Sequence, residues 1–134
     1  MERNGILVMI IEDEEALLQA ISQKLTKSGF ETITCTTATQ ALNYLKELRR
    51  LPDVIWLDYY LEDMDGLEFM NKMNENPEWK KLPVVVVSNS ASPQKVQSMM
   101  DRGVKRYLLK ADYQLKEIAD ILLEYTKNGK QKVG

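Results

Sequence analysis

The chain has 134 residues, of which 44% are hydrophobic and 28% are charged, so it is long enough for one domain with its own core and is not a disordered segment. Its net charge of −2 lacks the basic excess that is typical of nucleic-acid binders, and no apolar stretch reaches the roughly 18 residues of a membrane helix. The single cysteine, Cys35, cannot form an internal disulfide, and the N-terminus does not resemble a signal peptide, so we expect a cytoplasmic protein. The absence of histidine excludes Ser-His-Asp and Cys-His catalysis, and any phosphohistidine on the chain itself.

Apolar runs alternate with amphipathic stretches along the first half of the chain. The run at residues 6–11 predicts a strand buried on both faces, and a helical pattern follows it up to Ser28-Gly29. A short strand is expected over residues 31–35, and a second helix over residues 37–49, capped by its first residue, a threonine. The third strand is expected at residues 54–57.

The same alternation continues in the second half. Asp65-Gly66 turns the chain into a third helix, and a polar connection leads from it to a fourth strand at residues 84–87. Ser92-Pro93 favours the start of a fourth helix, because serine is a good cap and proline suits the first helical position. A fifth strand at residues 106–109 and a fifth helix over about residues 113–127 complete the pattern.

Five strand–helix units in succession predict a parallel sheet with helices on both faces. We therefore expect one α/β domain over residues 1–128, a doubly wound, flavodoxin-like (βα)5 fold with strand order 2-1-3-4-5, followed by a flexible tail at residues 129–134. In that order the crevice opens between strands 1 and 3, whose ends carry Asp13 and Asp58. These two carboxylates are therefore predicted to be neighbours.

Charged side chains stand where several of these strands end. Glu12 and Asp13 follow the first strand, Asp58 the third, and Lys110 the fifth, so all four should meet at one edge of the sheet. Clustered carboxylates repel one another unless positive charge intervenes, and Lys110 together with a hard cation such as Mg²⁺ can supply it. The chain has no glycine-rich nucleotide loop, so we expect a transferred phosphoryl group, with Asp58 as its nucleophile and Ser88 as a hydrogen-bond donor.

In their order and spacing these motifs resemble the receiver domain of bacterial two-component response regulators. Each motif alone is weak, but together they span nearly the whole chain, residues 6–125. They are ILVMIIEDE at residues 6–14, PDVIWLD at 52–58, MDG at 64–66, PVVVVS at 83–88 and YLLK at 107–110.

The resemblance implies a stand-alone, phosphorylation-activated switch. Asp58 would take a phosphoryl group from the phosphohistidine of a sensor histidine kinase or a histidine phosphotransfer protein. Asp13, Asp58 and the backbone carbonyl of Tyr60 would bind Mg²⁺, and Glu12 would act mostly through water. Such a domain is a phosphoacceptor and not an enzyme, apart from self-phosphorylation and autodephosphorylation.

The resemblance also assigns residues that respond to the phosphoryl group or tune its lifetime. Ser88 and Tyr107 correspond to a switch pair that alters the face built from the fourth helix, fifth strand and fifth helix. Tyr60, Asn89 and Ser90 occupy positions that tune dephosphorylation. The expected partners are the phosphodonor protein and an unknown downstream protein, with no nucleic acid or membrane, and the expected assembly is a monomer or a weak homodimer.

Several positions depart from the family pattern. Glu12 replaces the commoner aspartate and Ala111 replaces a proline. Asn89 replaces a small residue, so we expect a narrower entry to Asp58. Glu62-Asp63 stand where Pro-Gly is frequent, which predicts a less constrained and more acidic turn.

Two other functions stay open at this point. The departures are compatible with a constitutive docking module that has lost phosphotransfer. A phosphatase with an aspartyl nucleophile would place a second aspartate two residues after Asp58, but Tyr60 stands there. Taken singly, Glu12-Asp13 can cap a helix, Lys110 can be a solvated lysine and Ser88 can satisfy backbone groups.

Overall fold

A computed structural model of the chain describes residues 5–126. It contains a five-stranded, all-parallel sheet in the order β2-β1-β3-β4-β5, which confirms the predicted topology. The strands are β1 (Leu7–Ile11), β2 (Glu31–Cys35), β3 (Val54–Leu57), β4 (Val84–Ser88) and β5 (Arg106–Leu109). The helices are α1 (Glu15–Lys27), α2 (Ala38–Glu47), α3 (Gly66–Asn74), α4 (Pro93–Asp101) and α5 (Leu115–Glu124), with short 3-10 helices η1 (Trp79–Lys81) and η2 (Lys110–Asp112). Within residues 5–126, no helix is long and apolar enough to cross a membrane.

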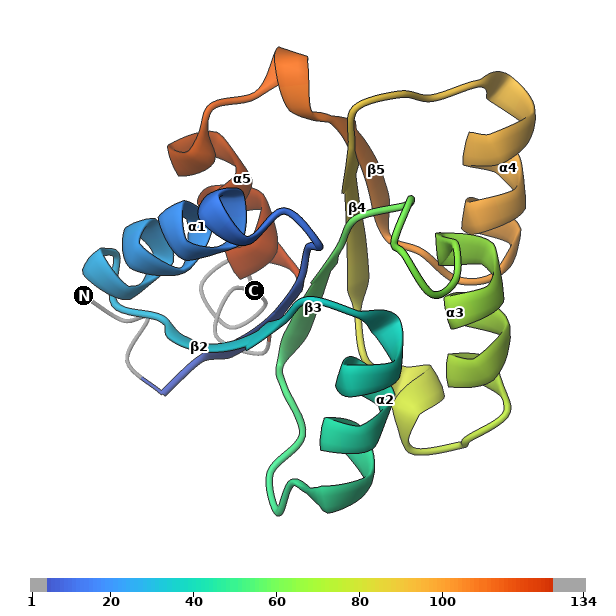
Figure 1. Cartoon of the computed structure of the whole chain (residues 1–134), viewed down its shortest axis with the longest axis horizontal. Helices are drawn as coiled ribbons and strands as arrows, with labels where there is room; N and C mark the ends of the chain where they lie inside the picture. Colours follow the sequence, from blue (N-terminus) through green and yellow to red (C-terminus); the bar gives the residue numbers. More distant parts are fainter. Residues whose placement is uncertain (1–4, 127–134) are drawn as a thin grey trace.

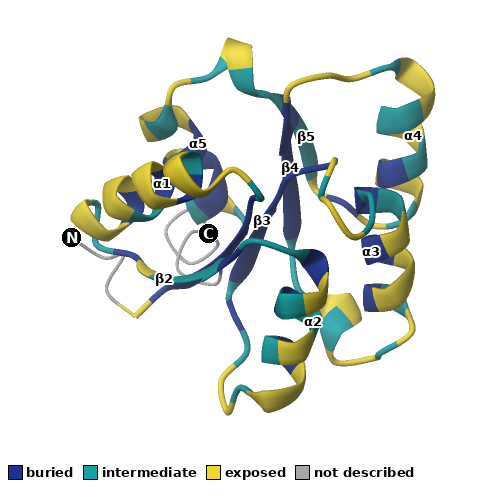
Figure 2. Ribbon diagram, in the orientation of Figure 1, coloured by how far each residue is buried: buried dark blue, intermediate teal, exposed yellow. Residues whose placement is uncertain are grey.

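Helices cover both faces of the sheet (Figure 1). α1 and α5 lie on one face, and α2, α3 and α4 lie on the other. All residues of β1, β3 and β4 are buried, whereas the edge strand β2 is partly exposed (Figure 2). Two-sided burial explains why the inner strands are continuous apolar runs rather than alternating patterns. Within β3, Val54 and Trp56 pack on the α1–α5 side, and Ile55 and Leu57 pack on the opposite side.

Side-chain caps fix the starts of three helices. Thr37 before α2 and Ser92 before α4 each accept a hydrogen bond from the backbone N–H three residues further on, as the sequence predicts. Asp65 does the same at the start of α3, and Pro93 occupies the first turn of α4. Each cap satisfies an N–H group that has no partner within its helix.

Cys35 is completely buried at the end of β2. Burial raises the pKa of its thiol to about 12, so the thiolate is disfavoured at neutral pH. The structure therefore supports a packing role for this cysteine rather than a reactive one.

Two helices differ from their predicted bounds. α2 ends at Glu47, two residues before the predicted end at Arg49, because Leu48 already has an extended backbone. α5 begins at Leu115 rather than near Tyr113, because Tyr113 and Gln114 have extended backbones after η2 ends at Asp112. The predicted end of the fifth helix, Lys127, and the predicted tail at residues 129–134 lie outside the described residues. The two 3-10 helices were not predicted, since three-residue turns leave no periodic signal.

Asp63 fastens the loop between β3 and α3 to the start of α2. Its carboxylate accepts hydrogen bonds from the backbone N–H of Ala38 at 3.1 Å, the backbone N–H of Thr39 at 2.7 Å and the Thr39 hydroxyl at 2.5 Å. The loop is also closed by a hydrogen bond of 2.7 Å from the Gly66 N–H to the Tyr59 carbonyl. The turn that Glu62-Asp63 was expected to leave less constrained is therefore held by the Asp63 side chain.

We expect Asp63→Ala to lower the free energy of unfolding by about 1 to 2 kcal/mol, because two N–H groups in the first turn of α2 and the Thr39 hydroxyl lose their acceptor. Partial burial opposes ionisation of Asp63, but the hydrogen bonds from Thr39 and Ala38 outweigh it and lower the pKa of this carboxyl. The stabilisation is therefore fully present above the unfolded pKa, near pH 4, and is lost as the pH falls through the lower folded value. Urea unfolding at several pH values measures this effect.

The matched control is Glu62→Ala, which removes the same charge from an exposed neighbour. It should leave the free energy of unfolding nearly unchanged. Equal losses in the two variants at pH 7 would show that Asp63 acts through general charge and not through its hydrogen bonds to the start of α2.

Candidate functional site

The predicted acidic residues meet at the carboxyl edge of the sheet. The Asp58 N–H donates to the Ile11 carbonyl at 3.0 Å, which extends the pairing of β1 with β3 by one residue. On the other side of β1, the Glu12 N–H donates to the Cys35 carbonyl at 3.0 Å. These backbone bonds set Glu12 and Asp58 side by side, and Glu12, Asp13 and Asp58 each offer a carboxylate oxygen within 4.8 Å of the others.

Two of the three carboxylates are almost inaccessible to water. Glu12 is 1% exposed and Asp58 is 7% exposed. The Lys110 Nζ, at the end of β5, donates to Glu12 Oε1 at 2.9 Å, and the other oxygen of Glu12 accepts from the Glu14 N–H at 3.1 Å. The predicted lysine therefore does reach the cluster. It brings one positive charge against three carboxylates.

This imbalance of charge acts on Asp58. Burial and repulsion by Glu12 raise the pKa of the Asp58 carboxyl to about 7, with a smaller contribution from Asp13 in the same direction. Lys110 and the Tyr59 backbone N–H oppose the rise without cancelling it. Burial and repulsion therefore disfavour the ionised form of Asp58, and a further positive charge would favour it.

The donor atoms of the cluster determine which metal ions fit. All three side chains offer carboxylate oxygens, and neither sulfur nor imidazole nitrogen is among them. Oxygen donors suit hard cations such as Mg²⁺, Ca²⁺ and Mn²⁺. Tyr60 lies in the loop between β3 and α3. The role of its backbone carbonyl as a further metal ligand stays a prediction.

The two residues of the predicted switch pair both contact Ser90. Ser88 is completely buried at the end of β4, and its hydroxyl oxygen accepts from the Ser90 N–H at 3.4 Å. The Tyr107 hydroxyl donates to the Ser90 carbonyl at 2.7 Å. Burial raises the pKa of the Tyr107 phenol, and the Ser88 hydroxyl opposes that shift. Asn89 is exposed between these contacts.

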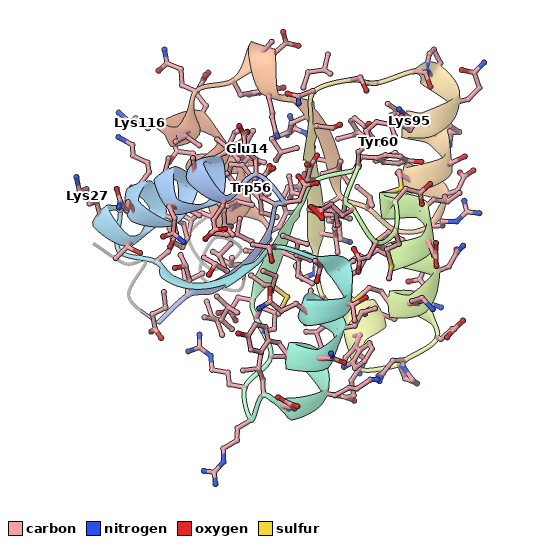
Figure 3. All side chains as sticks on the ribbon, in the orientation of Figure 1. Glu14, Lys27, Trp56, Tyr60, Lys95 and Lys116 are labelled. Carbon is pink, nitrogen blue, oxygen red and sulfur yellow. The ribbon has the colours of Figure 1, made fainter. Side chains whose placement is uncertain are left out.

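Tyr60 and Lys95 form a contact that the sequence did not predict. Tyr60 is 54% exposed, and its hydroxyl accepts a hydrogen bond from the ammonium of Lys95 on α4 (Figure 3). The Lys95 Nζ lies 4.3 Å from the centre of the Tyr60 ring and 4.8 Å from that of Tyr59. This cation–π contact joins the loop after Asp58 to the start of α4. Nothing in the local pattern of either segment indicates it, because the two residues are 35 positions apart.

Comparisons with known proteins agree with this geometry. A family model described as the response regulator receiver domain matches residues 8–122. The transcriptional regulatory protein KdpE of Mycobacterium tuberculosis (strain ATCC 25618 / H37Rv) is 36% identical over 105 residues, which cover 78% of this chain and 44% of KdpE. The chain spans less than half the length of the first curated relatives that it matches.

Solved structures share the fold. A CheY-like response regulator receiver domain protein from Methanospirillum hungatei JF-1 superposes with a TM-score of 0.81 at 20% identity, over 94% of this chain and 97% of that one. The phosphorylated cyanobacterial phytochrome response regulator RcpA gives a TM-score of 0.74 at 26% identity, over 94% of this chain and 91% of its own. Because the family match spans residues 8–122, nearly all of the described fold and the whole acidic edge of its sheet, this chain belongs to the response regulator receiver domain family of two-component systems.

Proposed function

We propose that this chain is a phosphorylation-controlled switch whose phosphoacceptor is Asp58. The observation that carries the proposal is the juxtaposition of Glu12, Asp13 and Asp58 within 4.8 Å of one another, with Lys110 bound to Glu12. The three carboxylates come from two neighbouring strand ends and the ammonium from a third, so their meeting is a property of the fold. Asp58 is the carboxylate at the end of β3, the central strand of the sheet.

The transfer reaction follows from the chemistry of a carboxylate nucleophile. One Asp58 oxygen attacks the phosphorus of a phosphohistidine, a P–O bond forms, and the P–N bond breaks with its electron pair returning to the imidazole nitrogen. The product is an acyl phosphate on Asp58. This chain contains no histidine, so the donor histidine belongs to a partner, either a sensor kinase or a phosphotransfer protein.

The acidic cluster fits Mg²⁺, with Asp13, Asp58 and the Tyr60 carbonyl as ligands and Glu12 acting through water. When bound, the ion would neutralise the charge of the carboxylates and of the phosphoryl oxygens. Lys110 is held at the cluster by Glu12, from where its ammonium can pair with a phosphoryl oxygen. The Ser88 hydroxyl can donate a hydrogen bond to another oxygen.

The contacts of Ser90 support a route from Asp58 to the outer surface. Because Ser88 and Tyr107 both bind Ser90, a Ser88 hydroxyl that turns toward a phosphoryl group changes the surroundings of the Tyr107 hydroxyl. Tyr107 lies on β5, so the change reaches the face built from α4, β5 and α5. A downstream protein that binds this face would then distinguish the two states.

We expect the purified chain, incubated with acetyl phosphate and Mg²⁺, to gain the mass of one phosphoryl group. The gain should be lost in Asp58→Asn, which keeps the shape of the side chain but not its nucleophilic carboxylate, and in samples stripped of metal with a chelator. Intact-mass spectrometry measures it directly. The control variant is Asp101→Asn, an exposed carboxylate on α4, which should be modified like the wild type. No modification in any sample would instead favour the constitutive docking module.

The raised pKa of Asp58 predicts a pH-dependent stability of the metal-free protein. Since the folded pKa of about 7 exceeds the ordinary value of 3.8, the folded state holds its proton longer, and stability falls as the pH rises from about 4 to about 7. Asp58→Asn removes this pH-dependent loss of stability. We expect the variant to be roughly 1 to 2 kcal/mol more stable than the wild type at pH 8, because the neutral amide avoids the burial and repulsion that disfavour the Asp58 carboxylate.

Urea unfolding of both proteins at pH 5 and pH 8, with and without Mg²⁺, measures this difference. Mg²⁺ should shrink the advantage of Asp58→Asn at pH 8, since the ion stabilises only the intact carboxylate cluster. A variant that is less stable than the wild type at pH 8 without metal would show that the carboxylates do not repel one another in the folded state.

A further inference from the structure

Lys95 on α4 holds the side chains of the two tyrosines that follow Asp58. Its ammonium donates to the Tyr60 hydroxyl and lies over both rings, 4.3 Å from the centre of the Tyr60 ring and 4.8 Å from that of Tyr59 (Figure 3). The two rings meet edge to face, with their centres 4.9 Å apart. Among residues 5–126 no carboxylate forms an ion pair with Lys95, so the tyrosines are the groups that fix its ammonium.

The two ends of this contact differ in how firmly they are held. The Lys95 backbone lies in the first turn of α4, where its N–H donates to the capping hydroxyl of Ser92 at 3.1 Å. The Tyr60 side chain is 54% exposed, so packing against the core does little to fix it. Lys95 is therefore the fixed partner, and the Tyr60 side chain is the one that gains an attachment.

That attachment matters for the loop between β3 and α3. The backbone bonds of the loop, a bridge between Tyr60 and Asp65 and the bond from the Gly66 N–H to the Tyr59 carbonyl, close it onto its own ends. Side chains join it to the neighbouring helices, because Asp63 binds the start of α2 and Tyr60 binds Lys95 on α4. Without the Lys95 contact, the half of the loop next to Asp58 would lose its attachment to α4.

We propose that Lys95 is a positioning residue for the metal site, because its grip on the Tyr60 side chain keeps the Tyr60 backbone carbonyl available to Mg²⁺ at the acidic edge. This inference rests on the proposed function, in which that carbonyl is a ligand together with Asp13 and Asp58. Groups that orient metal ligands typically change metal affinity by about 10-fold to 100-fold when they are removed. Lys95 acts through a side chain on a ligand that the backbone provides, so we expect a smaller effect.

Lys95→Met separates positioning from charge by the sign of its effect. The variant keeps an unbranched side chain but removes the ammonium. If only charge mattered, Mg²⁺ would bind more tightly, because a cation that repels it has gone. If Lys95 positions the loop, Mg²⁺ should bind roughly fivefold more weakly. Lys95→Arg restores a cation that can donate to a hydroxyl and stack on the rings, so it should bind Mg²⁺ like the wild type.

The measurement is the Kd for Mg²⁺ of the full chain labelled with ¹⁵N, followed through the backbone amide signals of residues 58–61. Tyr60→Leu removes the ring and the hydroxyl but keeps the backbone carbonyl, and it should weaken binding by a similar factor. Adding Lys95→Met to Tyr60→Leu should then change the Kd little, because the partner through which Lys95 acts is absent. The matched control is Lys116→Met, an exposed lysine on α5, which should leave the Kd unchanged.

Three results would each overturn the proposal. An unchanged or lower Kd in Lys95→Met, beside a wild type that binds Mg²⁺, would remove the role of Lys95 and leave the proposed function intact. Equal effects of Lys95→Met with Tyr60 and with Leu at position 60 would show that Lys95 does not act through the Tyr60 side chain. A wild type that binds no Mg²⁺ would overturn both the role of Lys95 and the metal chemistry of the proposed function.

Discussion

The parallel pairing of β1 with β3 is the constraint on which the site depends. The hydrogen bond from the Asp58 N–H to the Ile11 carbonyl fixes the register of these strands beyond their last apolar residues. A slip of one residue would turn Trp56 toward the opposite face and move Asp58 away from Glu12. The apolar residues that bury both faces of β3 therefore also set the spacing of the carboxylates.

The same register creates an electrostatic cost that the fold only partly offsets. Lys110 is the cation that binds Glu12, yet burial and the neighbouring carboxylates still raise the pKa of Asp58 to about 7. Asp58 cannot relieve the repulsion by moving into water, because its backbone is held by β1. A further positive charge at this edge of the sheet would therefore lower the electrostatic cost.

Most of the fold and the acidic cluster could be predicted from the sequence, because short-range patterns determine them. The strands are apolar runs, the caps Thr37 and Ser92 are local, and a parallel sheet brings its carboxyl ends together. The contacts that were missed are long-range and made by polar side chains. Asp63 binds residues 24 and 25 positions away, and no periodicity indicates which helix end an exposed carboxylate will meet. The absence of the family's Pro-Gly at Glu62-Asp63 suggested a less constrained turn, whereas the Asp63 side chain binds the turn to α2.

The position of Trp56 shows a second limit of sequence patterns. In an apolar run, tryptophan looks like any other large core residue, and only the three-dimensional structure reveals whether its N–H has an acceptor. Trp56 lies two positions before Asp58, and Lys110 both lines the cavity beside Trp56, between the sheet and helices α1 and α5, and binds Glu12. The cavity and the acidic cluster therefore share a side chain. Lys110 therefore connects the α1–α5 side of the sheet with the acidic edge.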